Sequence, residues 1–451
     1  MTQSIEIQPS GPLHARIRPP GSKSLTNRAL ICAALATGDS TLPGALDSED
    51  TRVMMDALRR LGIAVTHDRP SRTIRLTGCG GRLRTTFASM DAAGNLDSRV
   101  LNSWVELRTT PVQIDVANSG TSLRFLTALL TLGQGMFRLD GSPRMRQRPV
   151  QDLLDALAQL GGQAVSELGT GCPPVILAAH GLPGGKAAIA GNISSQFLSG
   201  LLMAAPYARS PVELVVAGEL VSQPYVEMTL AVMRAFGVSP QTEGLSRFRV
   251  AAGRGYRGRH YPIEPDASAA SYFFAAAAIA GGSVSVEGLS RQSLQGDVAF
   301  CECLRRMGCR VDYGTEAITV TGGPLVGIQA DMNAISDTVQ TLAAVALLAR
   351  GPTTITGVAH IRHKETDRIA ALAAELRKLG AEVDQRPDGL RITPGTRRGA
   401  VIETYDDHRM AMSMAIVGLA QPGVVIRDPG CTAKTYPEFF DDLRRVTSAK
   451  R

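Results

Sequence analysis

The chain has 451 residues, of which 44% are hydrophobic and 20% are charged, so it has the composition of an ordinary globular protein rather than a disordered or fibrous one. This length exceeds what a single hydrophobic core usually supports and predicts two domains or more. The formal charge of +7 predicts an attraction for anions. Aromatic residues make up only 4% and the basic residues are dispersed, which argues against nucleic acid and favours small acidic metabolites.

The first residues show neither the basic nor the apolar region of a secretory signal, and no apolar stretch is long enough to span a bilayer, so we expect a cytoplasmic protein. The seven cysteines are an odd number and are scattered through the chain, which does not indicate a disulfide framework. Cys301 and Cys303 lack a second ligand pair at metal spacing, and His360 and His363 stand among so many basic residues that no ion is needed to neutralise an anion. We therefore expect neither a metal nor a cofactor.

One pattern recurs five times along the chain: an amphipathic helix that ends at a glycine and is followed by a β-rich stretch. The glycines stand where a residue with positive φ ends a helix, at Gly62, Gly161, Gly237, Gly308 and Gly380. Residues 436–446 match the helical half of a sixth copy. The sequence thus predicts six units, each with helices against a mixed sheet.

Six units divide naturally into two domains of three, with substrate between them. The Gly- and Arg-rich segment 253–262 is the predicted connection; its GxGxxG pattern at 253–258 precedes an extended stretch rather than a helix, which excludes a dinucleotide site. The first interval between repeats is longer than the others, and the excess at 84–111 predicts a surface insertion.

The segment 19–28 contains the clearest candidate site. Gly21 and Ser22 open a predicted helix over 25–36, where free N–H groups and the helix dipole favour an anion. Lys23 adds a mobile charge, and Arg28 follows Ser24 by one turn on the same face. Similar helix starts occur at 117–124, where Gly120 allows close approach of a ligand, and at 191–197. A single start could be an ordinary N-cap, but three in one half of the chain favour anion binding.

Further cationic clusters lie at 144–149, 364–368, 406–409 and 431–435, and the last three mix donors with acids or hydroxyls. The cluster at 364–368 could also be an exposed lattice of ion pairs on a helix.

Read in order, these motifs resemble the EPSP synthase (3-phosphoshikimate 1-carboxyvinyltransferase) family over essentially the whole chain. They are Pro20-Gly-Ser-Lys-Ser with Asn27-Arg28, Asn118-Ser-Gly-Thr with Arg124, Arg144-Met with Arg148-Pro149, Ser194-Ser-Gln196-Phe, Lys364-Glu-Thr-Asp-Arg368, Asp407-His-Arg409 and Cys431-Thr-Ala-Lys434-Thr. The resemblance implies an α/β fold, a two-domain inside-out α/β barrel in which each domain has three βαβαββ units. It also implies discontinuous domains, one of residues 21–263 and one of residues 1–20 with 264–451, so that the chain crosses between them twice.

The family resemblance implies a shikimate-pathway transferase of aromatic amino acid biosynthesis. Such an enzyme transfers the enolpyruvyl group of phosphoenolpyruvate to the 5-hydroxyl of shikimate 3-phosphate, on the way to chorismate, by addition and elimination with release of phosphate. We expect small-molecule substrates, a monomer, domain closure on binding, and no nucleic-acid or membrane partner.

By resemblance, shikimate 3-phosphate is held by Lys23, Ser24, Arg28, Ser194, Ser195, Gln196, Ser222, Tyr225, Asp337 and Lys364. Phosphoenolpyruvate is held by Lys23, Gly120, Arg148, Gln196, Arg368, Arg409 and Lys434. The reaction needs a base for the hydroxyl proton and an acid for the methylene carbon. Asp337, Glu365 and Lys23 are the candidate catalytic residues, with the individual proton transfers left open.

Three positions depart from the common family pattern: Phe125, His360 and Gln223. Two other functions stay open at this point. A sister enzyme of the same fold transfers enolpyruvyl to UDP-N-acetylglucosamine and typically uses a cysteine, which the segment 144–150 lacks. A basic, non-catalytic binding module would explain the charge but not Asp337 or Glu365.

Overall fold

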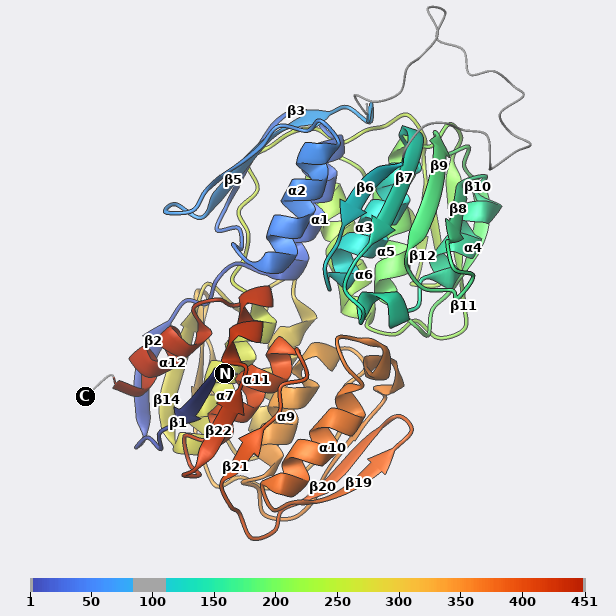
Figure 1. The fold of residues 1–451 in the computed structure, drawn as a ribbon. Helices are drawn as coiled ribbons and strands as arrows, with labels where there is room; N and C mark the ends of the chain where they lie inside the picture. The colour runs from blue at the N-terminus through green and yellow to red at the C-terminus, as the bar shows by residue number, and fades with distance from the viewer. Residues whose placement is uncertain (1–2, 84–110, 449–451) are drawn as a thin grey trace, which may run out of the picture.

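The computed structural model describes residues 3–83 and 111–448 (Figure 1). The predicted insertion at 84–111 therefore lies outside the described residues except for Pro111. Buried apolar side chains form two separate clusters, one drawn from residues 25–263 and the other from residues 7–17 and 267–446. We call residues 21–83 with 111–263 the upper body and residues 3–20 with 264–448 the lower body, as they lie in Figure 1.

The upper body contains three sheets. The first has the order β3 (Thr37–Pro43), β5 (Thr73–Cys79), β4 (Val65–Asp68). The second has the order β6 (Val112–Asp115), β7 (Gln134–Asp140), β9 (Val175–His180), β8 (Gln163–Ser166). The third has the order β10 (Gly185–Ala190), β11 (Val212–Ala217), β13 (Arg247–Val250), β12 (Gln241–Glu243).

The lower body also contains three sheets. Their orders are β2 (Leu13–Ile17), β14 (Gly282–Glu287), β16 (Ala317–Thr321), β15 (Arg310–Tyr313); then β17 (Gln329–Asp331), β18 (Thr353–Thr356), β20 (Gly389–Thr393), β19 (Glu382–Arg386); and β1 (Ser4–Ile7), β22 (Val424–Arg427), β21 (Ala400–Ile402). The strands β7, β11, β14, β18 and β22 each pair with one parallel and one antiparallel neighbour, so these five sheets are mixed.

Two kinds of helix alternate along the chain. One kind is buried on nearly every side: α1 (Lys23–Leu35), α3 (Gly120–Leu130), α5 (Ser195–Ala204), α7 (Ala267–Ala280), α9 (Val339–Ala346) and α11 (His408–Val417). These helices contact one another within each body. In the upper body α1 and α5 both pack against α3, and in the lower body α7, α9 and α11 pack against one another. The other kind has an exposed face: α2 (Glu49–Arg60), α4 (Gln151–Gln159), α6 (Gln223–Ala235), α8 (Phe300–Arg306), α10 (Arg368–Lys378) and α12 (Phe439–Ser448).

The prediction that five glycines end helices with a positive φ is confirmed. All five have positive φ, from 77° at Gly62 to 110° at Gly308. Each ends one of the helices α2, α4, α6, α8 and α10, and the strand that follows is an edge strand of its sheet. These helix ends were predictable because the turn after each helix favours a residue without a Cβ.

Much of the segment predicted as the connection, residues 253–262, is packed against the first upper sheet. Residues 256–263 run beside β3, where Thr37 and Thr41 form parallel bridges with Arg257 and His260. The segment thereby occupies the place that a parallel strand takes in the other upper sheets, and its backbone groups are paired rather than solvated.

The chain passes between the bodies at two adjacent places. The N–H of Ser22 donates to the carbonyl of Glu264 at 2.8 Å, and the N–H of Asp266 donates to the carbonyl of Pro20 at 2.9 Å. A Cβ on Gly21 would lie 1.9 Å from the carbonyl oxygen of Gly44, so only glycine fits this crossing. The two passages therefore form a short, tightly packed ribbon.

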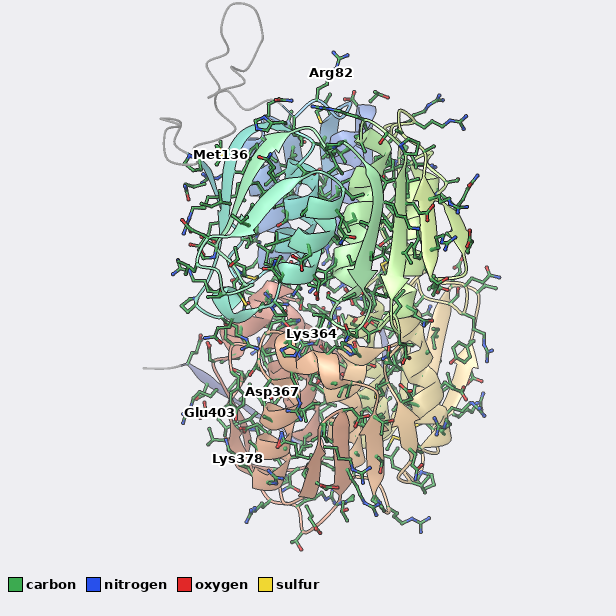
Figure 2. The ribbon with its side chains drawn as sticks, turned by 90° about the vertical axis from the view of Figure 1, so that its right-hand side faces the viewer. Arg82, Met136, Lys364, Asp367, Lys378 and Glu403 are labelled. Carbon is green, nitrogen blue, oxygen red and sulfur yellow. The ribbon has the colours of Figure 1, made fainter. Side chains whose placement is uncertain are left out.

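In the part of the chain that the structure describes, no helix combines the length and apolar character needed to cross a membrane. Seen from the side, Lys364 lies where the two bodies meet (Figure 2).

Candidate active site

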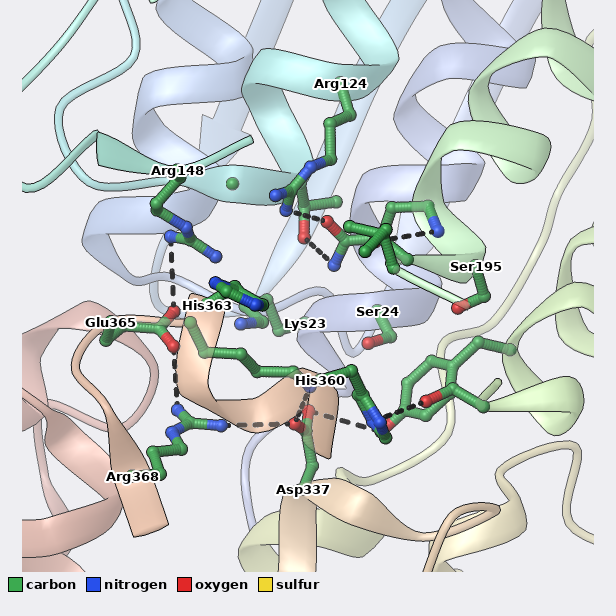
Figure 3. Close-up of a pocket in the computed structure, with 18 of the residues that line it drawn as sticks. Lys23, Ser24, Arg124, Arg148, Ser195, Asp337, His360, His363, Glu365 and Arg368 are labelled. Carbon is green, nitrogen blue, oxygen red and sulfur yellow. Dashed lines mark hydrogen bonds and ion pairs between the residues drawn. The ribbon is translucent and has the colours of Figure 1, made fainter. Parts of the chain in front are cut away.

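A cavity lies between the two bodies and encloses about 770 Å³ of space, part of it open to solvent (Figure 3). Six cationic side chains line it, against three carboxylates: Lys23, Arg124, Arg148, Lys364, Arg368 and Arg409 against Asp50, Asp337 and Glu365. This surplus of positive charge in a partly enclosed space favours small anionic ligands.

The upper wall is built from the starts of three buried helices. Serine side chains cap them: Ser22 accepts from the N–H of Leu25 on α1, Ser119 from Ser122 on α3, and Ser194 from Gln196 on α5. None of these helices has an acidic residue in its first turn. At α1 the carboxylate of Asp266 already accepts from the N–H of Lys23 at 3.0 Å. The positive dipole ends of α3 and α5 are available to an anion in the cavity.

Two arginines crowd the start of α3. A Cβ on Gly120 would lie 2.4 Å from a guanidinium nitrogen of Arg148 and 2.7 Å from one of Arg124, so the arginines can occupy these places only because this residue is glycine. Arg124 donates to Oε1 of Gln196 at 2.8 Å, and Gln196 donates to Thr121 at 3.2 Å. The Nε groups of both arginines are buried without a protein partner. Buried donors in this state are costly unless a ligand or water accepts from them.

Asp337 is the centre of the lower wall. Its Oδ1 lies 2.7 Å from Nζ of Lys364 and 3.4 Å from Arg368, and its Oδ2 lies 2.6 Å from Arg409. The hydroxyl of Tyr225, from the upper body, is 3.2 Å from Oδ2. Burial alone would raise the pKa of Asp337, but the charges of Arg409 and Lys364 outweigh it and hold the pKa well below its usual range.

Glu365 lies between arginines of both bodies. Its Oε2 accepts from Arg368 at 2.8 Å, and its Oε1 lies 3.7 Å from Arg148. Arg368 also donates to Asp407 at 2.7 Å, and Asp407 caps α11 by accepting from the N–H of Arg409. Burial would raise the pKa of Glu365, but Arg368 and Arg148 hold it well below its usual range, so the carboxylate is ionised in this arrangement.

Asp50 joins two lysines at the edge of the cavity. Its oxygens lie 3.2 Å from Nζ of Lys23 and 3.1 Å from Nζ of Lys434. Lys434 comes from the lower body and also donates to the carbonyl of Asn118 in the upper body at 2.7 Å. The contact thus links the two bodies through a buried ion pair.

Most of the predicted site residues lie together on the cavity wall: Lys23, Ser24, Gly120, Arg148, Ser194, Ser195, Gln196, Ser222, Tyr225, Asp337, Lys364, Glu365, Arg368 and Arg409. Lys434 lies just behind this wall, against Asp50. The alternative of an exposed ion-pair lattice at 364–368 does not describe Glu365 and Arg368, which are buried.

Arg28 is placed differently from the other predicted residues. Its guanidinium is buried among protein groups and donates to Thr229 at 2.7 Å, to the carbonyl of Tyr225 at 3.0 Å and to the carbonyl of Ser24 at 3.0 Å. The ring of Phe125, one of the positions that depart from the family pattern, lies 5.3 Å from this guanidinium. Neither residue lines the cavity, and both support the helix starts behind it.

Three residues near the cavity were not singled out from the sequence. Asp50 and His408 line it, and Asp297 lies behind Tyr225 at 2.9 Å. Burial, together with the charge of Asp337, raises the pKa of Asp297 to about 6. Ser48 and Asp50 look like an ordinary helix start, and Asp297 stands in a segment without any motif. His408 belongs to a motif that was recognised for its neighbours.

The chain matches the family model of EPSP synthase (3-phosphoshikimate 1-carboxyvinyltransferase) over residues 7–103 and 97–443. It is 47% identical over 430 residues to the 3-phosphoshikimate 1-carboxyvinyltransferase of Nostoc punctiforme, covering 95% of each chain. It is 45% identical to the chloroplastic enzyme of that name from Arabidopsis thaliana, covering 98% of this chain and 84% of the relative.

Among solved structures, an EPSP synthase from Acinetobacter baumannii superposes with a TM-score of 0.78 at 25% identity, covering 99% of this chain and 98% of the other. The enolpyruvyl transferase NikO from Streptomyces tendae, at 20% identity, shares the fold with a TM-score of 0.75, covering 99% and 98% of the two chains. By the match to the family model and the identity to these relatives, the chain belongs to the EPSP synthase family.

Proposed function

We propose that this protein transfers the enolpyruvyl group of phosphoenolpyruvate to the 5-hydroxyl of shikimate 3-phosphate and releases inorganic phosphate. The observation that carries the proposal is the surplus of cations over carboxylates in the cavity of a chain from this family. The three carboxylates of the wall cannot neutralise its six cations. Each substrate carries a phosphate and a carboxylate, so the pair brings the negative charge that the wall lacks. Planar guanidinium groups suit both kinds of anion.

Shikimate 3-phosphate would bind towards Tyr225. Ser24, Ser194, Ser195 and Ser222 offer hydroxyls there, and Lys364 offers a charge beside Asp337. Arg28, which contacts the backbone of Ser24, would act by holding this part of the wall.

Phosphoenolpyruvate would bind towards the start of α3, among Lys23, Gly120, Arg148, Arg368, Arg409 and Lys434, with Gln196 between the two subsites. The unpartnered Nε groups of Arg124 and Arg148 support this placement.

The two carboxylates would divide the proton transfers. Asp337 lies beside Lys364 and would take the proton of the 5-hydroxyl as its oxygen bonds to C2 of phosphoenolpyruvate. Glu365 lies between Arg148 and Arg368 and would give a proton to the methylene carbon, which becomes a methyl group. In the elimination a methyl proton returns to the enzyme and the phosphate leaves with its bonding electrons, with Lys23 neutralising the charge.

Glu365 must be protonated before it can act as an acid. In this arrangement the cations around it hold its pKa well below the usual range, against the effect of burial. The phosphate and carboxylate of phosphoenolpyruvate would engage Arg148, Arg368 and Lys434 and thereby weaken their hold on Glu365. Substrate binding would thus raise the pKa of Glu365 in the complex that reacts.

We further propose that the upper and lower bodies are the two domains, each formed by three copies of a βαβαββ unit in an inside-out barrel. Five sheets share one pattern of parallel and antiparallel neighbours, and each body has its own core, which supports this division. One chain supplies every residue of the proposed site, consistent with a monomer.

Phosphorus NMR of a mixture of the protein with both substrates tests the function. We expect the phosphoenolpyruvate signal to be replaced by inorganic phosphate while the 3-phosphate signal shifts to that of the product. UDP-N-acetylglucosamine in place of shikimate 3-phosphate is the control, and turnover with it alone would replace this proposal by the sister reaction.

A further inference from the structure

Arg144 makes an unusual set of contacts just outside the cavity. It precedes a 3-10 turn, η2 (Met145–Gln147), in the upper body. Its Nε and Nη2 donate to the carbonyl of Lys364 at 3.1 and 2.9 Å, and Nη2 also donates to the carbonyl of Arg362 at 3.2 Å. Both acceptors belong to the lower body. One guanidinium thus makes three hydrogen bonds across the junction without lining the cavity.

The carbonyls that it binds are those that a short helix leaves without partners. They lie at the end of the 3-10 helix η6 (Ala359–His363), and the next residues lead into α10, which begins at Arg368. The last carbonyls of a helix need an outside donor, and a positive charge is favourable there. Arg144 therefore acts as a cap supplied by the opposite body.

The segment 362–365, to which Arg144 donates, carries two residues on which the proposed reaction depends. Lys364 contacts Asp337, and Glu365 contacts Arg368, so a shift of this backbone would move both side chains. From below, Arg362 fixes the same segment by donating to the carbonyls of Pro387 and Arg386. Among the described residues, Arg144 is the one side chain of the upper body that donates hydrogen bonds to carbonyls of this segment.

The guanidinium is itself held in place. Its Nη1 donates to Oε1 of Gln147 at 3.1 Å, within the same turn. The turn ends at Arg148, which faces Glu365 at 3.7 Å. The segment 144–148 consequently meets the segment 362–365 at two points, one by backbone and one by side chain.

We propose that Arg144 is a positioning residue, a latch that holds Lys364 and Glu365 in reacting position only while the two bodies are closed on each other. This proposal rests on the proposed function. It adds that Arg144 couples the closure of the two bodies to the position of Glu365, the carboxylate proposed to transfer a proton. Opening of the cleft would break all three hydrogen bonds at once, because their donor and acceptors belong to different bodies.

The test compares Arg144→Gln with Arg146→Gln. Arg146 lies two residues further on, is half exposed, and pairs with Asp140 of its own body, so it is the matched control. We expect Arg144→Gln to lower kcat about ten- to hundredfold, with the KM for shikimate 3-phosphate changed less than about threefold. Arg146→Gln should stay within about twofold of the unsubstituted protein in both constants.

Hydrogen exchange of the peptide 359–368 gives a second readout that does not depend on turnover. With shikimate 3-phosphate bound, we expect faster exchange in Arg144→Gln than in Arg146→Gln, and no difference in thermal midpoint between the two ligand-free variants. Arg144→Lys keeps the positive charge but loses the planar guanidinium with its several N–H donors, so it should regain only a small part of kcat. This variant replaces Arg144→Gln if the glutamine variant does not fold.

Equal kcat and equal exchange in the two glutamine variants would overturn the proposal. A loss of kcat matched by a lower ligand-free thermal midpoint would also overturn it, since the role would then be structural. If the unsubstituted protein binds shikimate 3-phosphate but releases no phosphate from the two substrates, the proposed function fails, and the exchange comparison still decides the latch.

Discussion

The ammonium group of Lys434 lies 3.1 Å from Oδ1 of Asp50, although the two residues come from opposite ends of the chain and from different bodies. Lys23 shares the same carboxylate from the other side at 3.2 Å. Burial would raise the pKa of Asp50, but the charges of Lys434 and Lys23 lower it overall, so the carboxylate stays ionised. It separates two ammonium groups that would otherwise repel each other.

Asp50→Asn should therefore destabilise the protein. We expect a loss of about 2–4 kcal/mol in the free energy of unfolding, because the buried Lys434 and the partly buried Lys23 lose their common partner. Asp56→Asn, on the exposed face of the same helix, is the control and should cost less than about 1 kcal/mol. Urea unfolding at pH 7 measures both, and equal stability of the two variants would contradict the importance of the Asp50 pairs.

The carboxylates Asp337 and Glu365 should be needed for turnover rather than for folding. We expect Asp337→Ala and Glu365→Gln each to lower kcat by at least about a hundredfold, since each removes a proposed proton-transfer group. Lys23→Ala should act similarly. Glu382→Gln, exposed on β19, is the control. Steady-state kinetics and circular dichroism check the result; variants that fail to fold would instead indicate a structural role.

Gly120 should be irreplaceable because of the arginines packed on it. The methyl group of Gly120→Ala would displace the guanidinium groups of Arg148 and Arg124. We expect the KM for phosphoenolpyruvate to rise about tenfold, the effect of losing roughly one charge-assisted hydrogen bond. Gly11→Ala, where the new methyl meets no atom within 4 Å, should leave it unchanged. An unaltered KM in both variants would show that the arginines do not hold this substrate.

His360 should make the protein less stable in mild acid. Burial and the charge of Lys364 lower its pKa to about 3, whereas in the unfolded chain it takes up a proton near pH 6.5. Below pH 6.5 the unfolded state therefore binds a proton that the folded state does not bind, and the free energy of unfolding falls as the pH falls. From pH 7 to pH 5 this residue alone should cost about 1–2 kcal/mol.

Urea unfolding at the two pH values tests this sign. His360→Asn should lose less stability between pH 7 and pH 5 than the unsubstituted protein, while His14→Asn, at an exposed position, should behave like the unsubstituted protein. The same pH dependence in all three would mean that His360 takes up its proton in the folded state as well.

The sequence predicted the features that local chemistry determines. A glycine such as Gly161 ends a helix through its own φ, and a serine such as Ser119 caps the helix that follows it, so both leave a local pattern. Pairings between distant segments leave none. Nothing near Asp50 indicates Lys434, and nothing near Tyr225 indicates Asp297.

Long-range strand pairing was hidden for the same reason. The strand β1 pairs with β22 from the far end of the chain, and residues 256–263 pair beside β3. The protein partners of Arg28 were hidden too: its place in a helix-start motif gives no sign of Thr229 or of the carbonyl of Tyr225, to which it donates.

The most direct test of the central claim is the initial rate of phosphate release with phosphoenolpyruvate and either acceptor, for the unsubstituted protein and for Glu365→Gln. The account predicts rapid release with shikimate 3-phosphate, none above background with UDP-N-acetylglucosamine, and loss of the first rate in the variant. Release only with the UDP-sugar, or release that Glu365→Gln leaves unchanged, would contradict it.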